Sequence, residues 1–246
     1  GYSNTSSNKI DEFTIRVSYK KNKIWKIISF MNLIIFGPPG AGKGTQSNFI
    51  VNKFKLFQLS TGEILRLEIK NKTNLGIEIS STMNSGTLVS DDIVSKLTER
   101  FISNDKYKNR IIFDGYPRNI LQAKNLDQVL SKYKQKIDLV LKLSVSLDII
   151  KKRISGRSVC SICGKIYNEY FNPAPINSTC CASKFLQKRS DDTLDIAIRR
   201  FQTYEKNTEP LIEFYKSLNL LKVVNGENTI PEINDEISGL IDTNEG

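Results

Sequence analysis

A glycine-rich loop between a short apolar segment and a helical one constrains the fold of this chain more than any other feature. The loop spans residues 37–45, reads GPPGAGKGT, and follows the apolar residues 32–36. Phosphate oxygens need several converging backbone N–H donors; glycines let the backbone approach them, and a helix N-terminus adds a favourable field. The segment therefore predicts a phosphate-binding loop, in which Lys43 supplies a charge for a transferring phosphoryl group and Thr45 a hydroxyl near Mg²⁺.

One position of this loop departs from the strict pattern, which places Ser or Thr directly after the lysine. Here Gly44 stands between Lys43 and Thr45. A phosphate-binding loop by itself is compatible with GTPases, ATPases and kinases, so the remaining segments must decide the class of reaction.

The order of the predicted elements indicates an α/β fold. Apolar segments predict strands at residues 32–36, 57–59, 110–113, 139–143 and 220–224. Between and after them, amphipathic segments predict helices at residues 43–54, 60–70, 75–84, 91–101, 119–133, 147–155, 193–204, 210–217 and 231–240. Strands that alternate with helices form parallel sheets. We therefore expect a P-loop NTPase-type five-stranded parallel sheet with flanking helices.

Composition narrows the function classes without choosing among them. The 246 residues carry a formal net charge of +10, which suits nucleic acid, an acidic membrane or a phosphorylated small molecule. No apolar run approaches the roughly 18 residues of a membrane-spanning helix, so we expect no transmembrane segment. The absence of histidine excludes imidazole catalysis and imidazole metal ligation.

Seven segments together resemble the adenylate kinase family, over essentially all of residues 31–246. Besides the loop with Gln46, they are LSTGEILR (59–66), GTLVSD (86–91), FDGYPR (113–118) followed by Gln122, RISGR (153–157), RSDD (189–192) followed by Arg200, and VNG (224–226). The resemblance implies a nucleoside monophosphate kinase of the long-lid type. Such an enzyme moves a phosphoryl group reversibly from ATP, bound with Mg²⁺, to AMP, and gives two ADP.

The resemblance also implies a role for each matching residue. Contacts to ATP fall on Gly40, Ala41, Gly42, Lys43, Gly44, Thr45, Arg153, Arg157 and Gly226. Contacts to AMP fall on Thr61, Arg66, Thr87, Leu88, Val89, Gly115, Tyr116, Pro117, Arg118, Gln122, Arg189 and Arg200. The implied catalytic set is Lys43, Asp114, Arg118, Arg153, Arg157, Arg189 and Arg200, in which Asp114 holds waters of Mg²⁺.

The chemistry of phosphoryl transfer supports the same assignment. The reaction needs positioning and charge neutralisation more than covalent help from the protein. Planar guanidinium groups suit phosphate oxygens better than ammonium groups do, and six arginines stand at strand ends, helix starts or lid hinges. Water in such a site would hydrolyse the donor, so we expect the two inserts to close over the substrates.

The resemblance divides the chain into domains. Residues 31–59, 90–155 and 193–246 form the core, residues 60–89 the NMP-binding insert, and residues 156–192 the lid, where helical periodicity stops. The NMP-binding insert opens with the capping box Ser60-Thr61-Gly62-Glu63. Residues 1–30 form a basic N-terminal extension that we expect to be disordered.

Four cysteines cluster in the lid as Cys160, Cys163, Cys180 and Cys181. Tetrahedral zinc takes four N or S ligands, usually as two separated pairs, and some adenylate kinases carry a structural zinc in the lid. The fourth ligand is open. Ser183 stands at the expected position but is a weak ligand, and Cys181, next to Cys180, would have to point the same way as its neighbour. A lid held by hydrogen bonds without metal is the alternative.

Several alternatives remain open at this stage. A GTP:AMP phosphotransferase of the same fold would keep the acceptor motifs, because the donor base is read largely by backbone. UMP and CMP kinases share the loop, but the long lid and Gln122 favour AMP. A basic nucleic-acid-binding module would need a basic face studded with aromatic residues. We expect a monomer that binds ATP or GTP and AMP but no nucleic acid, in the cytoplasm or alternatively the mitochondrial matrix.

Overall fold

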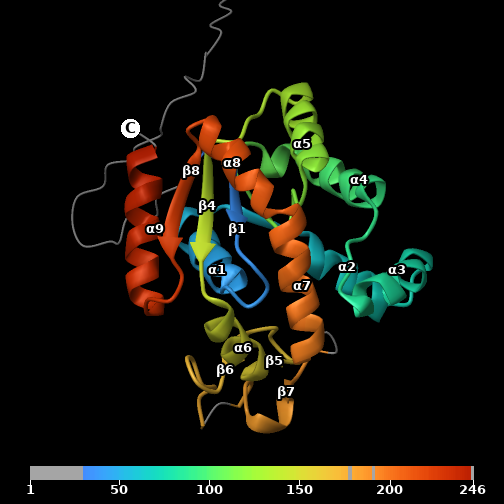
Figure 1. The fold of residues 1–246 in the computed structure, drawn as a ribbon, viewed down its shortest axis with the longest axis vertical. Coiled ribbons are helices and arrows are strands. Elements are labelled where there is room, and N and C mark those ends of the chain that lie inside the picture. The colour runs from blue at the N-terminus through green and yellow to red at the C-terminus, as the bar shows by residue number, and fades with distance from the viewer. Residues whose placement is uncertain (1–29, 177–178, 190–191, 245–246) are drawn as a thin grey trace, which may run out of the picture.

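The computed structural model describes residues 30–176, 179–189 and 192–244 (Figure 1). The predicted extension over residues 1–30 lies outside the described residues, apart from Phe30. Within the described part, a five-stranded sheet has the order β2-β3-β1-β4-β8, and all neighbouring strands are parallel. Its strands are β1 (Leu33–Phe36), β2 (Phe57–Ser60), β3 (Ile111–Asp114), β4 (Leu139–Ser144) and β8 (Leu221–Asn225). The predicted fold class is confirmed.

Helices cover both faces of this sheet. They are α1 (Lys43–Phe54), α2 (Thr61–Lys70), α3 (Asn74–Ser85), α4 (Asp91–Ile102), α5 (Ile120–Lys132), α6 (Leu147–Ser155), α7 (Leu194–Asn207), α8 (Glu209–Ser217) and α9 (Ile230–Asn244). Short 3₁₀ turns lie at Asp105–Tyr107 and Ser183–Phe185. The helices predicted from the sequence are present, and their ends differ from the prediction by a few residues.

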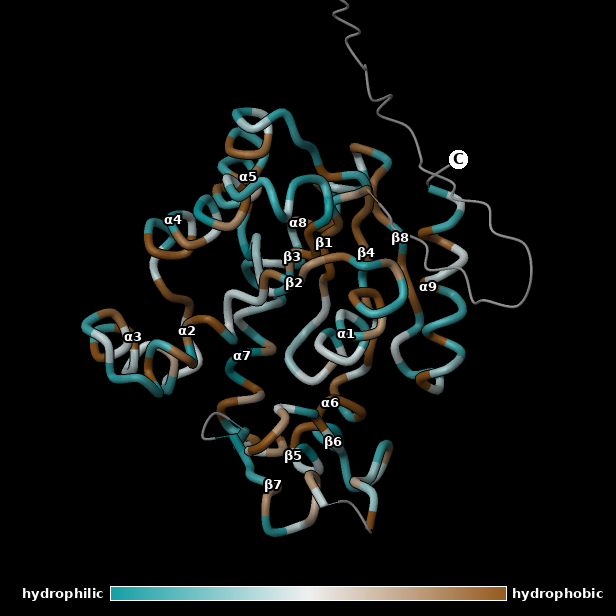
Figure 2. Tube along the Cα trace, turned by 180° about the vertical axis from the view of Figure 1, so that it is seen from behind, coloured by the Kyte–Doolittle hydropathy of each residue, from teal (hydrophilic) through white to brown (hydrophobic). Residues whose placement is uncertain are grey.

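The period-2 alternation of strand side chains builds two hydrophobic layers. Ile34 and Phe36 of β1 pack with residues of α4, α5 and α8, whereas Leu33 and Ile35 pack with residues of α1 and α9. All four side chains are buried, as expected for a parallel sheet with helices on both faces. In Figure 2 the central strands are largely hydrophobic and the surrounding loops largely hydrophilic.

Helices α2 and α3 form a pair to one side of the sheet (Figure 1). The side chain of Ser60 accepts a hydrogen bond from the backbone N–H of Glu63 and caps α2, and Thr73 caps α3 in the same way. The two helices approach so closely that a Cβ at Gly76 would lie 2.0 Å from the carbonyl oxygen of Glu68. Glycine at this position therefore allows the pair to pack.

A second, antiparallel sheet lies below α6 (Figure 1). Its order is β6-β5-β7, with β5 at Arg157–Cys160, β6 at Ile166–Asn168 and β7 at Leu186–Gln187. The sequence pattern predicts no strands between residues 156 and 192, so these three strands are a difference from the expectation. Strands β6 and β7, with three and two residues, are too short to leave a recognisable alternation, and β5 begins with the polar residues Arg157 and Ser158.

Candidate active site

The glycine-rich loop lies at the carboxyl edge of the large sheet, between β1 and α1. Gly40 and Gly42 have φ angles of 82° and 98°, a conformation that L side chains rarely adopt, so the loop needs glycine at both positions. The first backbone N–H groups of α1 have no partners within the helix, and Lys43, Gly44 and Thr45 line a cleft. This end of α1 therefore suits a phosphate.

Lys43 is held inside the loop that precedes it. Its Nζ donates hydrogen bonds to the carbonyl oxygens of Gly37 and Pro38, at 2.6 and 3.1 Å. Burial lowers the pKa of Lys43 to about 8; the Asp114 carboxylate opposes this shift, while nearby arginines add to it. The ammonium group is thus poorly solvated, so that a phosphate beside it would stabilise its charged form.

Three adjoining cavities meet at a few basic side chains. The largest, of about 650 Å³, runs from the loop and α1 to the small sheet. A second, of about 40 Å³, lies between α2 and the segment that follows α3, and a third, of about 70 Å³, lies between them. Arg200 lines all three, Arg118 lines the two smaller ones, and Lys43 lines the largest and the third. The arrangement offers space for two anionic groups that meet at Lys43, Arg118 and Arg200.

Arg118 is fixed by the turn that precedes α5. Its Nε donates to the carbonyl oxygen of Gly115 at 2.8 Å, and its backbone N–H donates to Oε1 of Gln122 at 2.7 Å. Burial, followed by the like charge of Arg200, lowers the pKa of Arg118 to about 10. Its guanidinium remains protonated at neutral pH and borders the two smaller cavities.

Glu63 joins two of the predicted phosphate-binding arginines across the cleft. Its Oε1 accepts hydrogen bonds from Arg66 at 2.6 Å and from Arg189 at 2.8 Å. Arg157 makes a two-point ion pair with Asp192 in a similar way. Sequence reasoning assigned Glu63 only to the cap of α2 and missed its place between the two guanidinium groups. Carboxylates therefore occupy the hydrogen-bonding groups of these arginines, and bound phosphates would compete with the carboxylates for them.

Arg153 ties three segments together at the end of α6. It donates to the carbonyl oxygen of Ala41 at 3.1 Å and to that of Gly226 at 2.7 Å. Its guanidinium carbon lies 5.4 Å from the ring centre of Phe171, a cation–π contact with the region of the small sheet. Burial lowers the pKa of Arg153 from its usual value. The planar group forms one wall of the largest cavity, where an aromatic base could stack.

Most residues predicted to contact the acceptor line the 40 Å³ cavity. They are Thr61, Arg66, Thr87, Leu88, Val89, Gly115, Arg118, Gln122 and Arg200. Gln122 is buried. Its Nε2 donates a hydrogen bond to Asp91 at 2.6 Å, and its Oε1 accepts one from the backbone N–H of Arg118. Arg189 lines the largest cavity instead.

Three other predicted site residues lie around these cavities without lining them. Tyr116 is buried, and its hydroxyl contacts the carbonyl oxygen of Gln122 at 3.3 Å; Pro117 follows it through a cis peptide bond. Gly226 presents its carbonyl oxygen to Arg153. Tyr116 and Gly226 thus contact Gln122 and Arg153, which themselves line the cavities.

Three side chains that carry oxygen atoms line the largest cavity together with Lys43, and these atoms suit a hydrated cation. Asp114 ends β3 and is 8% exposed, and its Oδ2 accepts a hydrogen bond from Nε2 of Gln58 at 2.9 Å. Oε1 of Gln46 is buried and accepts no hydrogen bond within the described part of the chain. Both side chains line the largest cavity together with Thr45. Carboxylate, amide and hydroxyl oxygens match the preference of Mg²⁺ and its waters, so the donor set fits this ion.

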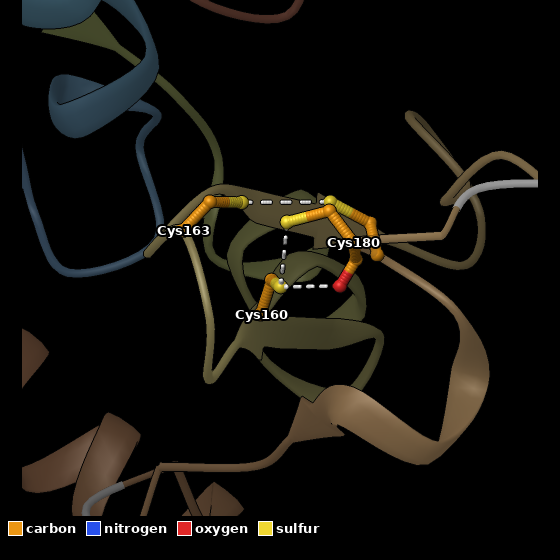
Figure 3. A group of neighbouring side chains, drawn as sticks. Cys160, Cys163 and Cys180 are labelled. Carbon is orange, nitrogen blue, oxygen red and sulfur yellow. Dashed lines mark hydrogen bonds between the residues drawn. The ribbon is translucent and has the colours of Figure 1, made fainter.

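The four cysteines converge at one end of the small sheet, and Figure 3 labels Cys160, Cys163 and Cys180 among them. Their sulfur atoms all lie within 4.8 Å of one another, with 4.0 Å between Cys160 and Cys180 and 3.5 Å between Cys163 and Cys181. Zinc–sulfur bonds of about 2.3 Å in a tetrahedron place the sulfurs about 3.8 Å apart. Both adjacent cysteines enter the group despite the expected difference in direction, and Ser183 is exposed. The four thiols fit a zinc ion.

The structure also shows whether any helix of the described residues could cross a membrane. None of the helices within residues 30–176, 179–189 and 192–244 combines the length and the apolar character needed to cross a bilayer.

A phosphate-binding loop that faces clustered arginines across adjoining cavities is typical of P-loop kinases that act on small anionic substrates. Comparison with known proteins narrows this class. The chain matches the adenylate kinase family over residues 35–220. It is 47% identical to the adenylate kinase of Pelagibacter ubique over 211 aligned residues. This alignment covers 86% of this chain and 99% of the relative.

Two more distant relatives agree. The adenylate kinase of Fusobacterium nucleatum is 40% identical over 207 residues, 84% of this chain and 96% of the relative. That of Methanothrix thermoacetophila is 39% identical over 213 residues, 86% of this chain and 98% of the relative. The chain therefore belongs to the adenylate kinase family.

Proposed function

We propose that this chain transfers a phosphoryl group reversibly from ATP, bound with Mg²⁺, to AMP and gives two ADP. The observation that carries the proposal is the meeting of the three cavities at Lys43, Arg118 and Arg200. Two nucleotides that enter from opposite sides would bring their phosphates together at these three cations. Such a meeting point suits direct transfer between two bound substrates.

In this proposal the loop and the arginines divide the phosphates between them. The donor phosphates lie on the N–H groups of residues 40–45 and on Lys43, with the donor base beside Arg153. Arg66 and Arg118 hold the acceptor phosphate, and Arg157, Arg189 and Arg200 neutralise the transferring group. Arg66 and Arg189 then exchange the Glu63 carboxylate for phosphate oxygens.

The chemical step needs no general base. An oxygen of the AMP phosphate, already deprotonated at neutral pH, forms a bond to the γ-phosphorus while the bond to the β–γ bridging oxygen breaks. The fixed cations stabilise the charge that spreads over the transferring group and the leaving ADP. When bound, Mg²⁺ supplies further neutralisation of the donor phosphates. Asp114, Thr45 and Gln46 would hold its waters.

A bisubstrate analogue in which a phosphate chain joins two adenosines tests the proposal. We expect one molecule to bind per chain, to exclude ATP and AMP together, and to bind far more tightly than either nucleotide, because both halves share one ordering cost. Isothermal titration would measure this. Failure of the analogue to bind would contradict the end-to-end arrangement.

The identity of the donor base needs a separate measurement. Steady-state rates with ATP and GTP as donors, at equal AMP, distinguish the proposed ATP:AMP enzyme from a GTP:AMP phosphotransferase. We expect a higher kcat/KM for ATP. A preference for GTP would replace ATP in the proposal while leaving the acceptor site unchanged.

The lowered pKa of Lys43 predicts that donor binding is linked to protonation. Because its pKa is lowered to about 8, Lys43 is largely neutral near pH 9, whereas a bound phosphate favours the charged form and raises its pKa. Binding of ATP should therefore take up about one proton near pH 9, and its affinity should fall as the pH rises above about 8. Titration calorimetry in buffers of different ionisation enthalpy measures this uptake, and Lys43→Ala should abolish it. Equal uptake by the variant would contradict the assignment.

We propose that the four cysteines bind a structural zinc ion that stiffens the small sheet and takes no part in the reaction. Thiolate ligation requires reduced cysteines, and all four are free of disulfides. This supports a reducing compartment, and we propose the cytoplasm. We also propose that the chain acts as a monomer.

Removal of the zinc should loosen the lid and not the core. Chelation, or Cys181→Ser, should speed amide exchange in β5–β7 (Figure 1) by at least about tenfold, because metal binding supplies folding free energy to small sheets of this kind. Exchange in β1 and β4 should change little. Ser183→Ala is the matched control and should retain one zinc per chain by elemental analysis. Loss of zinc from that control would instead make Ser183 the fourth ligand.

A further inference from the structure

Gln58 lies on β2 at the edge of the site, next to the neighbouring strand β3. Strands β2 and β3 are parallel neighbours, with Gln58 paired to Ile112 and Ser60 paired to Asp114. From this position Nε2 of Gln58 donates a hydrogen bond of 2.9 Å to Oδ2 of Asp114. Both side chains line the largest cavity together with Lys43 and Thr45.

Asp114 is a buried carboxylate that lies near two cationic side chains, so a hydrogen bond to it affects how it is oriented. Asp114 is 8% exposed and lies close enough to Lys43 and Arg118 to affect the pKa of both. Within the described residues, however, it forms an ion pair with neither. Lys43 donates to the carbonyl oxygens of Gly37 and Pro38 instead. A buried carboxylate needs hydrogen-bond donors to offset the cost of its desolvation, and Gln58 supplies one to Oδ2.

A glutamine amide is suited to that task because it carries no charge. A lysine or arginine at this position would neutralise Asp114 and weaken its attraction for waters of a cation. The amide satisfies Oδ2 and leaves the full negative charge, with the lone pairs of Oδ1, available to the cavity. Partners that orient a carboxylate near a metal typically change metal affinity about tenfold to a hundredfold when they are removed.

We propose that Gln58 is a positioning residue that orients Asp114 toward the hydrated Mg²⁺ of the donor nucleotide. The inference rests on the proposed function, in which Asp114 holds waters of that ion. Gln58 acts through Asp114 and touches neither the nucleotide nor the transferring phosphoryl group.

A double-mutant cycle on metal-dependent binding tests this inference. The measured quantity is the affinity for the non-transferable β,γ-imido analogue of ATP with Mg²⁺, divided by its affinity in EDTA. Gln58→Leu should lower this ratio about tenfold and leave the affinity in EDTA unchanged. In an Asp114→Ala background, the same substitution should have no further effect, because its partner is already absent.

Controls separate a positioning role from a structural one. Gln128→Leu makes the same chemical change at an exposed position of α5 and should leave the ratio unchanged. Gln58→Met keeps an unbranched side chain but removes the donor, and it should repeat the effect of Gln58→Leu. It replaces Gln58→Leu in the test if leucine disturbs β2. Thermal unfolding reports the integrity of each variant.

The outcomes distinguish this inference from the proposed function. If Asp114→Ala retains the wild-type ratio, the proposed metal role of Asp114 fails. If Asp114→Ala lowers the ratio and the Gln58 variants do not, only the positioning role fails. Independent, multiplicative losses in the double variant would also overturn it, because Gln58 would then act without Asp114.

Discussion

Replacing Lys43 with alanine should lower turnover about a thousandfold, a loss of about 4 kcal/mol of transition-state stabilisation. The ammonium group borders both the cleft beside the loop and the cavity that adjoins the acceptor space. It is therefore the cation placed to stay with the phosphoryl group as it passes between nucleotides. Loss of an interaction that strengthens in the transition state lowers kcat more than it raises KM.

The fold should survive this substitution. Burial holds the folded-state pKa of Lys43 near 8, below its ordinary value of 10.5. Between these values the unfolded chain binds more protons than the folded one, so the charged lysine disfavours folding at neutral pH, and this cost shrinks as the pH rises from 8. Removing the side chain removes that cost along with two hydrogen bonds to carbonyl oxygens. We therefore expect an unfolding temperature close to that of the wild type.

A coupled assay in both directions, together with thermal unfolding, measures these effects. Lys96→Ala is the matched control, because Lys96 forms an exposed ion pair with Asp92 on α4 and lies outside the three cavities. It should keep normal kinetics. A Lys43→Ala enzyme with nearly normal turnover would refute the role proposed for the loop lysine, whatever its stability.

The core of the fold could be predicted because each of its signals is local. Apolar segments with few polar interruptions marked the buried parallel strands, and residues 37–45 carry the loop pattern without reference to distant residues. Helix ends were predicted less well. Helix α9 continues to Asn244, past the predicted end at residue 240, because Ile237 and Ile241 keep its inner face buried.

Contacts between distant segments could not be predicted. Glu63 matches a capping box, yet its carboxylate also reaches Arg189, 126 positions later. Gln58 sits in an apolar strand, and only the pairing of β2 with β3 shows that it faces Asp114. The pattern of four cysteines predicted a cluster, but the convergence of Cys180 with its neighbour Cys181 depends on how the loop before β7 turns.

Arg118→Ala should lower kcat/KM for AMP at least about a hundredfold, or about 2.7 kcal/mol, while the affinity for ATP alone changes little. The guanidinium borders the two smaller cavities and is absent from the lining of the largest one. Its Nε is committed to the carbonyl oxygen of Gly115, which aims the remaining N–H groups of the fork. A phosphate that binds two of these groups gains both charge and direction.

Arg118→Lys separates charge from geometry at this position. Lysine keeps the positive charge but loses the fork and the bond to Gly115, so it should recover only a minor part of the loss. Arg100→Ala, at an exposed position of α4, is the matched control and should behave as wild type. Initial rates with AMP varied at saturating ATP, and ATP binding measured without AMP, give the two quantities needed. Full recovery by lysine would mean that Arg118 acts as a charge alone. An equal loss of ATP affinity would mean that Arg118 contacts the phosphates of both nucleotides and would contradict its assignment to the acceptor alone.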